Sequence, residues 1–292
     1  MYIARGTSTA GAIDSIAASA SITSPFLIKL ATRITARVTG RSVHVGWYVF
    51  APGQTSWDIV QSLLSGRGRP TVRVTIPEGL TYRECASLLQ TRAEVDSAGF
   101  VQWCENDSVV ALYAPNAPSM EGYLMPDTYD VLWRESPADV GSKLASYARS
   151  MWRSLYGAPE NRHTTLTLAS IVQAEAAQVD EMPTIAGVYA NRLRRGLKLE
   201  ADPTVQYGIG WKKRVLYRHL ADVSPYNTYV HHGLPPGPIC NPSKKAVEAA
   251  LRPENHTFIF FVARGDGSGR HRFASNASEH IQNVRRYRAT RR

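Results

Sequence analysis

The sequence of 292 residues is poor in cysteine, and its few cysteines argue against two classes of protein. Cys85, Cys104 and Cys240 are odd in number and lack the spacing of metal ligands, so neither a disulfide framework nor a zinc site is predicted. A disulfide between Cys85 and Cys104 stays open for an oxidising compartment. The neighbouring His231 and His232 have no third ligand at helical or hairpin spacing, so we predict no metal and no cofactor.

Long apolar runs are also missing. A membrane-spanning helix needs about 20 consecutive, mostly apolar residues. The longest weakly polar stretch, residues 12–34, includes Asp14, Lys29 and Arg33 among many serines and threonines. The N-terminus does not show the basic, then apolar, then small-residue order of a signal peptide. The sequence therefore predicts neither a transmembrane segment nor a signal peptide.

Acidic residues are outnumbered by basic ones, 24 to 34, which gives a formal net charge of +10. An excess of this size favours an anionic partner such as nucleic acid, acidic lipid or a carboxylate-bearing polymer. A solvated arginine-rich surface is the alternative, because part of the charge lies in the tail, residues 285–292. No helix-turn-helix, zinc-finger or RNA-binding motif is present, so we do not expect a nucleic-acid partner.

With 43% hydrophobic residues, the chain can form a sizeable core, and its length favours two domains. Residues 1–46 show only weak helical patterns. Residues 46–76 predict a strand, a turn at Pro52-Gly53, a helix with Ile59, Leu63 and Leu64 facing inward, and a strand. Residues 76–92 repeat this order, with Thr81 as N-cap and Glu84 as its capping-box partner.

The rest of the chain mixes helices and strands. Single helices are expected over residues 96–112, 137–155, 165–179, 183–196, 241–251 and 276–288. Strands are expected after residue 197, over residues 257–264, and after a hairpin turn that begins at residue 264. Because the strands and helices do not alternate regularly, the predicted fold class is α+β.

One glutamate occupies an apolar helical face within residues 165–196. Leu168, Ile171, Val172 and Val179 recur at the spacing of one helical face, and Glu175 falls on that same face. A carboxyl on such a face either forms an ion pair or has a raised pKa, because burial disfavours its charged form. A raised pKa suits a general acid, whereas the alternative is an ion pair with Arg192 or Arg194. Spacing alone does not decide between them.

The next helix begins at Pro183, and its apolar face is interrupted by Asn191. A buried amide must be hydrogen-bonded, so Asn191 either orients a side chain such as Glu175 or ties down a loop. A long segment rich in proline and glycine, residues 224–242, is expected to lack regular structure. There Tyr226, Asn227 and Tyr229 combine flat apolar faces with hydrogen-bonding groups, which suits a sugar ring. We expect these side chains to contact glycan, and we expect Tyr226→Ala or Asn227→Ala to weaken turnover while stability changes by less than about 1 kcal/mol.

Six segments together resemble the endolytic murein transglycosylases, the YceG-like family of bacterial cell-wall enzymes. They are IPEGLTYRECASLL, EGYLMPDTYDV, ASIVQAEA, NRLRRGLKLEADPTVQYGIG, SPYNTYVHHGLPPGPICNP and FFVARGDGSGRHRFASNASEH, and the resemblance covers residues 48–287. It implies a small LysM-like module over residues 1–75 and a larger mixed α+β catalytic domain over residues 76–292. LysM modules bind glycan, although a role in packing on the catalytic domain is equally open.

In that family the second acidic position of the ASI segment is catalytic, and it falls on Glu175. The position two residues earlier is often Glu in the family, but here it is Gln173. The resemblance places Glu121 and Asp127 near the active cleft, with local capping or turn roles as the alternative. The residues that we expect to bind substrate are Asn191, Asp202, Thr204, Gln206, Tyr207, Tyr226, Asn227, Thr228, Tyr229, Asn241, Glu121 and Asp127.

The resemblance implies a lytic transglycosylase that cuts the bond between N-acetylmuramic acid and N-acetylglucosamine within peptidoglycan strands. Glu175 would first donate and then accept the proton, and a 1,6-anhydro ring would form without water. A hydrolytic muramidase, with Asp127, Asp202 or Glu121 activating water, is the first alternative. A protein that only binds glycan is the second.

Partners and location are implied by the same resemblance. Peptidoglycan strands are the expected partner, and peptidoglycan synthases are further candidates. Members of the family usually carry one N-terminal membrane anchor, which this sequence does not show. We therefore expect the protein at the inner membrane, facing the periplasm, if an anchor precedes the sequence, and in soluble form otherwise.

Overall fold

The structure is a computed structural model that describes residues 2–4, 7–19, 25–51, 53–156, 161–210 and 215–290. The contacts divide the chain into two compact units. The first comprises residues 1–74, 89–96 and 129–136, and the second comprises residues 75–88, 97–128 and 137–292. The sequence-based division at residue 75 does not include the two later segments of the first unit. Whether the units are a LysM-like module and a catalytic domain stays a prediction.

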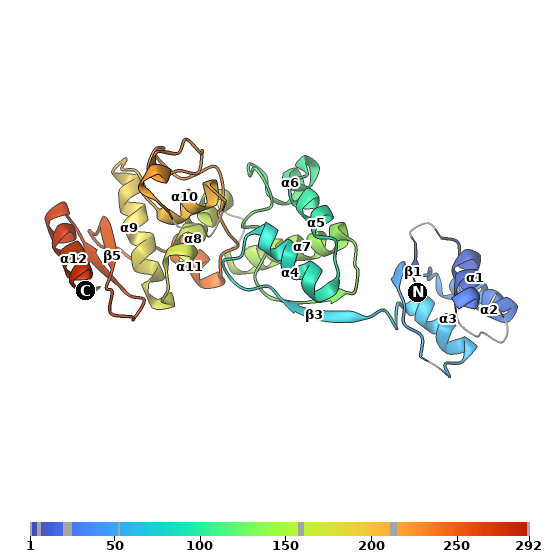
Figure 1. Cartoon of the computed structure of the whole chain (residues 1–292). Coiled ribbons are helices and arrows are strands. Elements are labelled where there is room, and N and C mark those ends of the chain that lie inside the picture. The colour runs from blue at the N-terminus through green and yellow to red at the C-terminus, as the bar shows by residue number, and fades with distance from the viewer. Residues whose placement is uncertain are drawn as a thin grey trace. The chain divides into compact units, whose positions relative to one another are not determined.

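The first unit combines three helices with a two-stranded pairing at the N-terminus. Its elements are β1 (Tyr2–Ile3), α1 (Thr9–Ser19), α2 (Pro25–Thr39), β2 (Gly46–Trp47), α3 (Ser56–Ser65) and most of β3 (Thr71–Thr75) (Figure 1). Strands β1 and β2 are antiparallel, with Tyr2 opposite Trp47. Residues 1–46, which show only weak helical patterns, thus form two helices and supply much of the core of this unit.

Helix α3 follows the sequence-based expectation. Thr55 and Asp58 form a capping box at its start, and Gly66 ends it in the left-handed conformation, with φ of 71°. Its inward side chains join the core, whose members are Ile3, Ala12, Ile13, Ile16, Ile28, Tyr48, Ile59, Val60, Leu63 and Leu64. The turn predicted at Pro52-Gly53 lies partly outside the described residues, because Pro52 is not among them.

The second unit is mainly helical. Its helices are α4 (Tyr82–Ala93, whose last residues belong to the first unit), α5 (Ser97–Cys104), α6 (Asp107–Tyr113), α7 (Pro137–Tyr156), α8 (Arg162–Glu175), α9 (Met182–Arg194), α10 (Asp202–Gly208), α11 (Lys244–Leu251) and α12 (Ala277–Ala289). Two 3-10 turns, η1 (Val179–Glu181) and η2 (Tyr217–Ala221), connect them. Helix α8 contacts α9, α10 and α11. The unit is therefore built around the helix that ends in Glu175.

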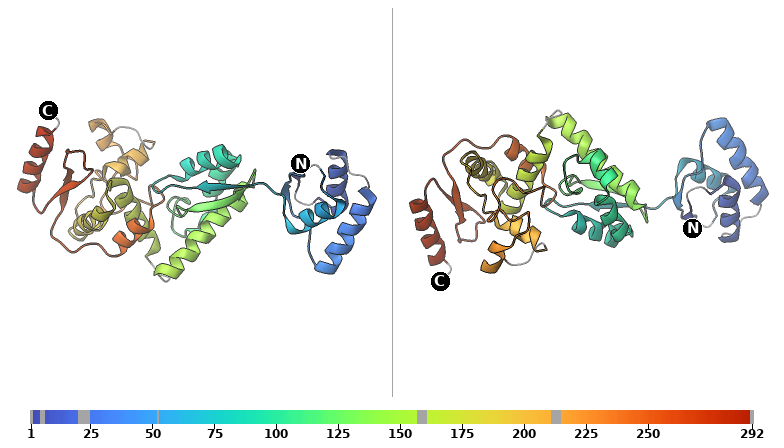
Figure 2. Two further views of the ribbon diagram at one scale, coloured as in Figure 1. Left: turned by 90° about the horizontal axis from the view of Figure 1, so that it is seen from below. Right: turned by 90° about the horizontal axis from the view of Figure 1, so that it is seen from above.

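The strands form small separate pairs. Strand β4 (Thr128–Leu132) pairs with β3, and β5 (Phe260–Ala263) pairs antiparallel with β6 (His271–Ala274). Helix α12 covers this last hairpin (Figure 2). The mixture of helices with small sheets agrees with the predicted α+β class.

Several predicted elements are confirmed in detail. Thr81 and Glu84 form the expected capping box, since the Thr81 N–H donates to Glu84 Oε2 at 2.9 Å and the Glu84 N–H donates to Thr81 Oγ1 at 3.2 Å. Pro183 lies in the first turn of α9. Asn276 caps α12, and the β5–β6 hairpin forms where the glycine-rich turn was expected.

Other predictions are wrong at particular residues. The single helix expected over residues 96–112 is two helices, because Asn106 caps the second one through Ser108 and Val109 N–H groups. Val179 is exposed in η1 and does not extend the apolar face of α8. Residues 197–201 do not form the expected strand; the Glu200 N–H instead donates to the Thr228 carbonyl. Ser243, two residues later than expected, caps α11.

The cysteines and the surface complete the picture of the fold. Cys85, Cys104 and Cys240 are buried free thiols, so the disulfide left open between the first two is absent.

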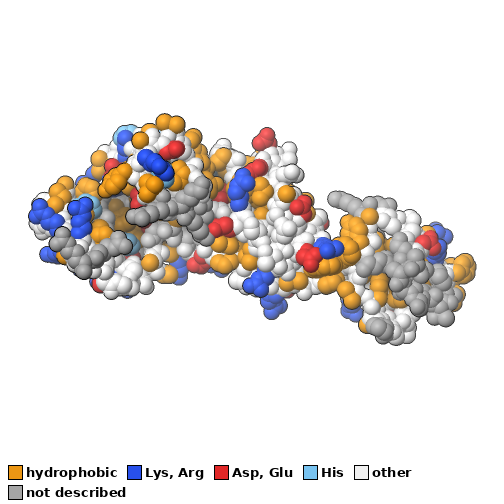
Figure 3. All heavy atoms as spheres, in the orientation of Figure 1, with side chains coloured by type: hydrophobic (Ala, Val, Ile, Leu, Met, Phe, Trp, Pro, Cys, Tyr) orange, Lys and Arg blue, Asp and Glu red, His pale blue; other side chains and the backbone are white. Residues whose placement is uncertain are grey.

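Basic side chains are scattered in several small groups on the face drawn in Figure 3. Within the described residues, no helix combines the length and the apolar character needed to cross a bilayer.

Candidate active site

A cleft of about 260 Å³ opens in the second unit at the C-terminal end of α8. It is lined by residues of α8, α9, α10, α12, β5 and two connecting segments. These are Glu175, Tyr189, Arg192, Leu199, Glu200, Asp202, Tyr229, Phe260, Phe261 and His280. Of the residues proposed from sequence to act on substrate, the cleft contains Glu175, Asp202 and Tyr229.

Glu175 is the last residue of α8 and is partly buried. Leu168, Ile171 and Val172, which precede it at helical spacing, are buried in the core. Within the described chain, its carboxyl accepts a single hydrogen bond, from the Tyr189 hydroxyl to Oε1 at 2.8 Å. Burial raises the pKa of Glu175 to about 7, the Tyr189 hydrogen bond opposes this rise, and the negative charge of Asp202 adds to it. The second carboxyl oxygen has no protein donor among the described residues.

The ion pair left open by the sequence does not form. Arg192 pairs with Glu200, and its guanidinium lies over the ring of Phe260, 5.4 Å from the centroid. Arg194 donates to Asn191 Oδ1. Neither arginine therefore neutralises the carboxyl of Glu175, which lies in apolar surroundings.

Asp202 enters the cleft at the first turn of α10. Its Oδ1 accepts a hydrogen bond from the Tyr229 hydroxyl at 2.7 Å. Burial raises the pKa of Tyr229, and the hydrogen bond to Asp202 adds to the rise, so this phenol stays neutral. Two threonines bring the segments together, because Thr228 Oγ1 accepts from the Ala201 N–H at 3.0 Å and lies 2.9 Å from Thr204 Oγ1. Thr204 and Thr228 thus position the cleft residues without lining the cleft.

The opposite wall is aromatic. His280 stacks on Phe260 with centroids 4.8 Å apart, and Phe261 meets the edge of Tyr189 at 5.9 Å. Burial lowers the pKa of His280, and the charge of Arg192 lowers it further, so the ring is neutral near neutral pH. The wall therefore offers apolar surface and a neutral imidazole beside the paired arginine.

Two roles were predicted for Asn191, to orient a side chain such as Glu175 or to tie down a loop, and its contacts fit the second. It is buried, and its amide donates to the carbonyl oxygens of His256 and Phe258, both at 2.8 Å. A Cβ at Gly187 would lie 2.4 Å from the Glu254 carbonyl oxygen, so this glycine lets the same segment approach α9. Asn191 thereby positions the chain that leads into β5 and does not reach the cleft.

Asn227 also has a structural role. It is fully buried, and its amide nitrogen donates to the carbonyl oxygens of His219, Leu220 and Asp222. Its Oδ1 accepts from the Tyr229 N–H at 2.9 Å. The expectation that its removal leaves stability unchanged does not fit these four bonds. Asn227 holds the segment that presents Tyr229 to the cleft.

Glu121 forms a second group, outside the cleft lining. It is 1% exposed, and it accepts from the Tyr82 N–H at 3.0 Å and from the Tyr207 hydroxyl at 3.3 Å. Burial raises the pKa of Glu121 to about 8 against the effect of these hydrogen bonds. Tyr226 packs against Tyr207 with ring centroids 4.7 Å apart. This buried group links the segment around Glu121 to α10.

The remaining predicted residues lie elsewhere. Asp127 accepts from the Tyr147 hydroxyl at 2.6 Å, which lowers the pKa of Asp127 and marks it as an ordinary ionised surface group. Asn241 is buried, with Oδ1 accepting from the Leu124 N–H and the amide donating to the Leu80 carbonyl. Gln206 is half-buried on α10. Asp127, Asn241 and Gln206 do not line the cleft.

His231 and His232 are the neighbouring histidines for which a metal site was considered. His232 lies with Nδ1 3.1 Å from the Gly196 carbonyl oxygen. Within the described ranges, no group of three or more His, Cys, Asp or Glu side chains is arranged to hold a metal ion.

Gln173, where the family often has Glu, accepts a hydrogen bond from the Ser243 N–H at 2.9 Å and so ties α8 to the start of α11.

Sequence reasoning missed most of the cleft wall. The sequence predicted no functional role for Tyr189, Glu200, Phe260, Phe261 and His280. The phase of Tyr189 on α9 could have indicated a contact with α8. The others come together only through the β5–β6 hairpin and α12, which no local pattern relates to α8.

The chain is similar to known proteins over most of its length. The model of the YceG-like family matches residues 1–286. The endolytic murein transglycosylase of Bacillus subtilis is 31% identical over 244 residues, which are 77% of this chain and 68% of that protein. Endolytic murein transglycosylases of Streptococcus pneumoniae are 26% identical over 281 residues, and the chain spans about half, 50%, of their length.

A solved structure is similar as well. The crystal structure of a yceG-like protein from Listeria monocytogenes has a TM-score of 0.65 and 26% sequence identity to this chain. The match covers 96% of this chain and 97% of the other. The similarity therefore extends over both compact units.

Proposed function

The chain belongs to the YceG-like family, and we propose that it is an endolytic murein transglycosylase that uses Glu175 as both acid and base. The observation that carries the proposal is the partly buried carboxyl of Glu175, which has a pKa of about 7 and lines a cleft. A general acid must be protonated near the working pH and must lose that proton readily. Glu175 meets both requirements.

In the first step, Glu175 donates its proton to the glycosidic oxygen between N-acetylmuramic acid and N-acetylglucosamine. The bond from that oxygen to the anomeric carbon breaks, and positive charge develops on the sugar ring. Asp202, whose carboxylate lies in the same cleft, can stabilise this charge. Tyr229 holds Asp202 in place through its hydroxyl.

In the second step, the Glu175 carboxylate accepts the proton of the muramic acid 6-hydroxyl, whose oxygen attacks the anomeric carbon. A 1,6-anhydro ring closes, Glu175 returns to its protonated form, and no water is consumed. Hydrolytic glycosidases normally need two catalytic carboxyl groups. Here the substrate supplies the nucleophile, so one acid suffices for the chemistry.

Tyr189 regulates the proton affinity of Glu175 in this proposal. Burial raises the pKa of the Tyr189 phenol well above its ordinary value, so it remains a hydrogen-bond donor throughout the reaction. Its bond to Oε1 leaves Oε2 to face the substrate. Phe260 and Phe261 offer the apolar surface that the faces of sugar rings prefer.

The other predicted binding residues divide into two groups under this proposal. Tyr207, Tyr226 and Gln206, on or beside α10, remain candidates for contact with sugars farther along the strand. Most of the rest position the cleft through hydrogen bonds within the protein, and they are Asn191, Thr204, Asn227, Thr228, Asn241 and Glu121. Asp127, which bonds Tyr147 at the surface, has no part in the site.

The test is Glu175→Gln, which keeps the size and the acceptor for Tyr189 but cannot transfer a proton. The release of soluble fragments from purified sacculi should fall at least about 100-fold, the usual contribution of general acid and base catalysis. Wild-type products should carry anhydro ends, which are lighter than reducing ends by one water. As a matched control, Glu248→Gln changes an exposed glutamate of α11 and should retain full activity.

Hydrolysis is the second candidate, because Asp202 alone of the three proposed water-activating acids shares the cleft with Glu175. A carboxylate beside a catalytic acid can activate water. Products with reducing ends, lost in both Glu175→Gln and Asp202→Asn, would replace the lytic proposal by this one. An active Glu175→Gln enzyme would refute both.

The place of action follows from the substrate. We propose that the enzyme acts at the outer face of the bacterial inner membrane, in the periplasm, where new strands are exposed. Peptidoglycan synthases, which make those strands, are the proposed protein partners. LysM-like glycan binding by the first unit remains part of the proposal. It is testable by sedimenting the chain with sacculi before and after removal of residues 1–70, which precede β3.

A further inference from the structure

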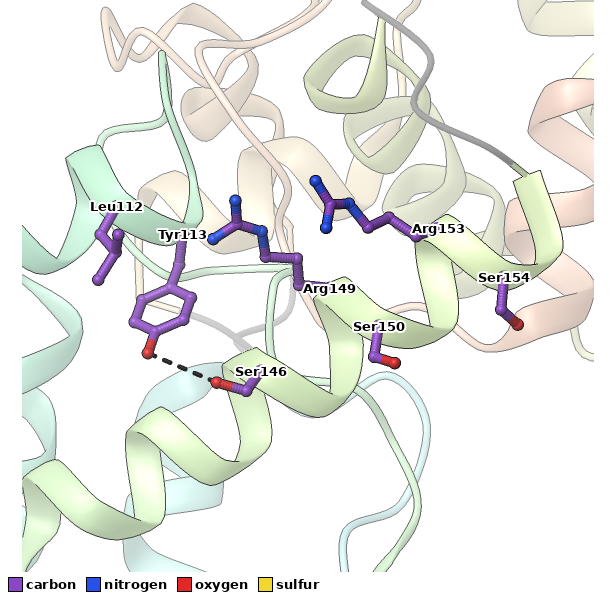
Figure 4. A pocket seen from close by; sticks show the side chains of 7 residues that line it. All are labelled: Leu112, Tyr113, Ser146, Arg149, Ser150, Arg153 and Ser154. Atoms are coloured by element: carbon purple, nitrogen blue, oxygen red, sulfur yellow. Dashed lines mark hydrogen bonds between the residues drawn. The ribbon is translucent and has the colours of Figure 1, made fainter.

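A second groove lies in the same unit along the exposed side of α7 and shares no residue with the cleft. It has a volume of about 740 Å³ and is lined by Leu112, Tyr113, Ser146, Arg149, Ser150, Arg153 and Ser154 (Figure 4). We call it the α7 groove. None of its residues takes part in the mechanism described above, so its composition needs a separate explanation.

Two unneutralised cations dominate the α7 groove. Arg149 and Arg153 are both exposed and lie four residues apart, so their side chains extend from the same side of α7 (Figure 4). Neither one forms an ion pair or a hydrogen bond with any residue in the described part of the chain. Like charges at this spacing repel each other, so the helix tolerates the pair at a cost in stability.

A third guanidinium, that of Arg162, lies next to the α7 groove without lining it. Arg162, the first residue of α8, lies over the rings of Tyr123 at 4.9 Å and Trp152 at 5.5 Å, and it donates to the Tyr113 carbonyl at 3.4 Å. Its Nε is buried without a partner among the described residues. Burial lowers the pKa of Arg162, the neighbouring Tyr123 opposes this effect, and the positive charge of Arg149 lowers the pKa further. An anion in the groove would relieve this repulsion.

The polar lining fits carboxylates. Guanidinium groups bind carboxylates through paired hydrogen bonds. The hydroxyl groups of Ser146, Ser150 and Ser154 follow one another at four-residue spacing beside the arginines, and they can bond the amides of a peptide. Leu112, which is 59% exposed, supplies apolar surface at one end. Carboxylates, amides and small apolar side chains occur together in a short peptide.

We propose that the α7 groove binds the carboxylate groups of the short peptides that branch from the glycan strand cut at Glu175. This inference rests on the proposed function, because that function brings such a strand to this unit. Helix α8 runs between the two sites: Arg162, its first residue, donates to the carbonyl of the groove residue Tyr113, and Glu175, its last residue, lines the cleft. A helix of 14 residues spans about 20 Å, the length of a few sugar units. One strand can therefore reach both sites.

A phosphate-bearing polymer would satisfy the same guanidinium groups. It has no covalent connection to the strand in the cleft, however, and it offers no amides to the serine hydroxyls. The peptide carboxylates are the occupant that the position and the lining favour together, and phosphate becomes an outcome of the test.

The experiment compares glycan strands that carry peptides with strands from which an amidase has removed them. Binding is measured in Glu175→Gln protein, so that the strands stay intact. Adding Arg149→Gln and Arg153→Gln should weaken binding of peptide-bearing strands about tenfold, as expected for two exposed ion pairs, and leave binding of peptide-free strands unchanged. The control, Arg252→Gln with Arg286→Gln, removes the same charge from exposed positions outside both sites and should change neither.

In the active enzyme, the same pair of substitutions should raise KM for peptide-bearing strands about tenfold with little change in kcat. An equal loss of binding on both kinds of strand, or an equal loss in the control, would mean nonspecific charge and overturn the proposal. Competition by inorganic phosphate but not by a free peptide with several carboxylates would assign the groove to phosphate and also overturn it. Peptide-dependent binding without any anhydro product from wild type would instead refute the proposed function alone.

Discussion

From the pKa of Glu175 we predict how the stability of the folded protein depends on pH, independently of catalysis. In the folded protein this pKa is about 7, whereas the ordinary value is 4.5. A carboxyl whose pKa is raised on folding favours the folded state below pH 4.5, where it is protonated in both states. That advantage is lost as the pH rises through 7, because ionisation is easier in the unfolded chain.

The size of the effect follows from these two values. The difference between 4.5 and about 7 corresponds to about 3 kcal/mol, at about 1.4 kcal/mol for each tenfold change in proton affinity. This is an upper bound, because Glu175 is only partly buried and water can approach its charged form. Glutamine at this position accepts the same Tyr189 hydrogen bond but never ionises. Glu175→Gln should therefore gain stability relative to wild type as the pH rises from 4.5 to 8.

The assay is urea unfolding of wild type and Glu175→Gln at several pH values in this range. Subtracting the two curves removes the contribution of other titrating groups, among them Glu121, whose pKa is about 8. The difference should favour the variant by up to about 3 kcal/mol at pH 8 and should shrink towards pH 4.5. A difference that does not depend on pH, or one that favours wild type at pH 8, would refute the buried and often neutral carboxyl on which the mechanism depends.

Two further predictions concern residues that support the cleft. Tyr189→Phe removes the hydrogen bond that lowers the pKa of Glu175, so the alkaline limit of activity should move to higher pH; a pH–rate profile that stays in place would contradict the assigned contact. Asn227→Ala removes three hydrogen bonds that the buried Asn227 amide donates to carbonyl oxygens and should lower the free energy of unfolding by about 2 to 3 kcal/mol. Tyr226→Phe serves as its control, and urea unfolding should show a change of less than about 1 kcal/mol there.

Local patterns in the sequence predicted most helices and the C-terminal hairpin, because caps and periodicity act over a few residues. The capping box of Thr81 with Glu84 and the cap at Asn276 formed as expected. The same local logic failed where a side chain broke a helix, as Asn106 does, or where a tertiary hydrogen bond replaced a strand, as at Glu200. Those outcomes depend on partners that lie outside any short window of sequence.

The candidate site was predictable only in part for the same reason. Glu175 stood out because its helical phase placed a carboxyl among apolar residues. Asp202 and Tyr229 were proposed separately, but their mutual hydrogen bond joins residues 27 positions apart. The wall formed by Phe260 and His280 depends on α12 packing against β5, which is a long-range contact without a local pattern.

A raised pKa alone would not have distinguished Glu175 from Glu121, since burial raises both and raises that of Glu121 further. The difference lies in what surrounds each carboxyl. Glu121 is 1% exposed, and both of its oxygens accept hydrogen bonds from the protein, at Tyr82 and Tyr207. Glu175 has a protein donor to one oxygen and lines an open cleft that also holds Asp202. A general acid must reach its substrate. The free carboxyl oxygen of Glu175, and not its pKa, therefore indicates that Glu175 is the catalytic residue. Glu121 instead holds α10 in place.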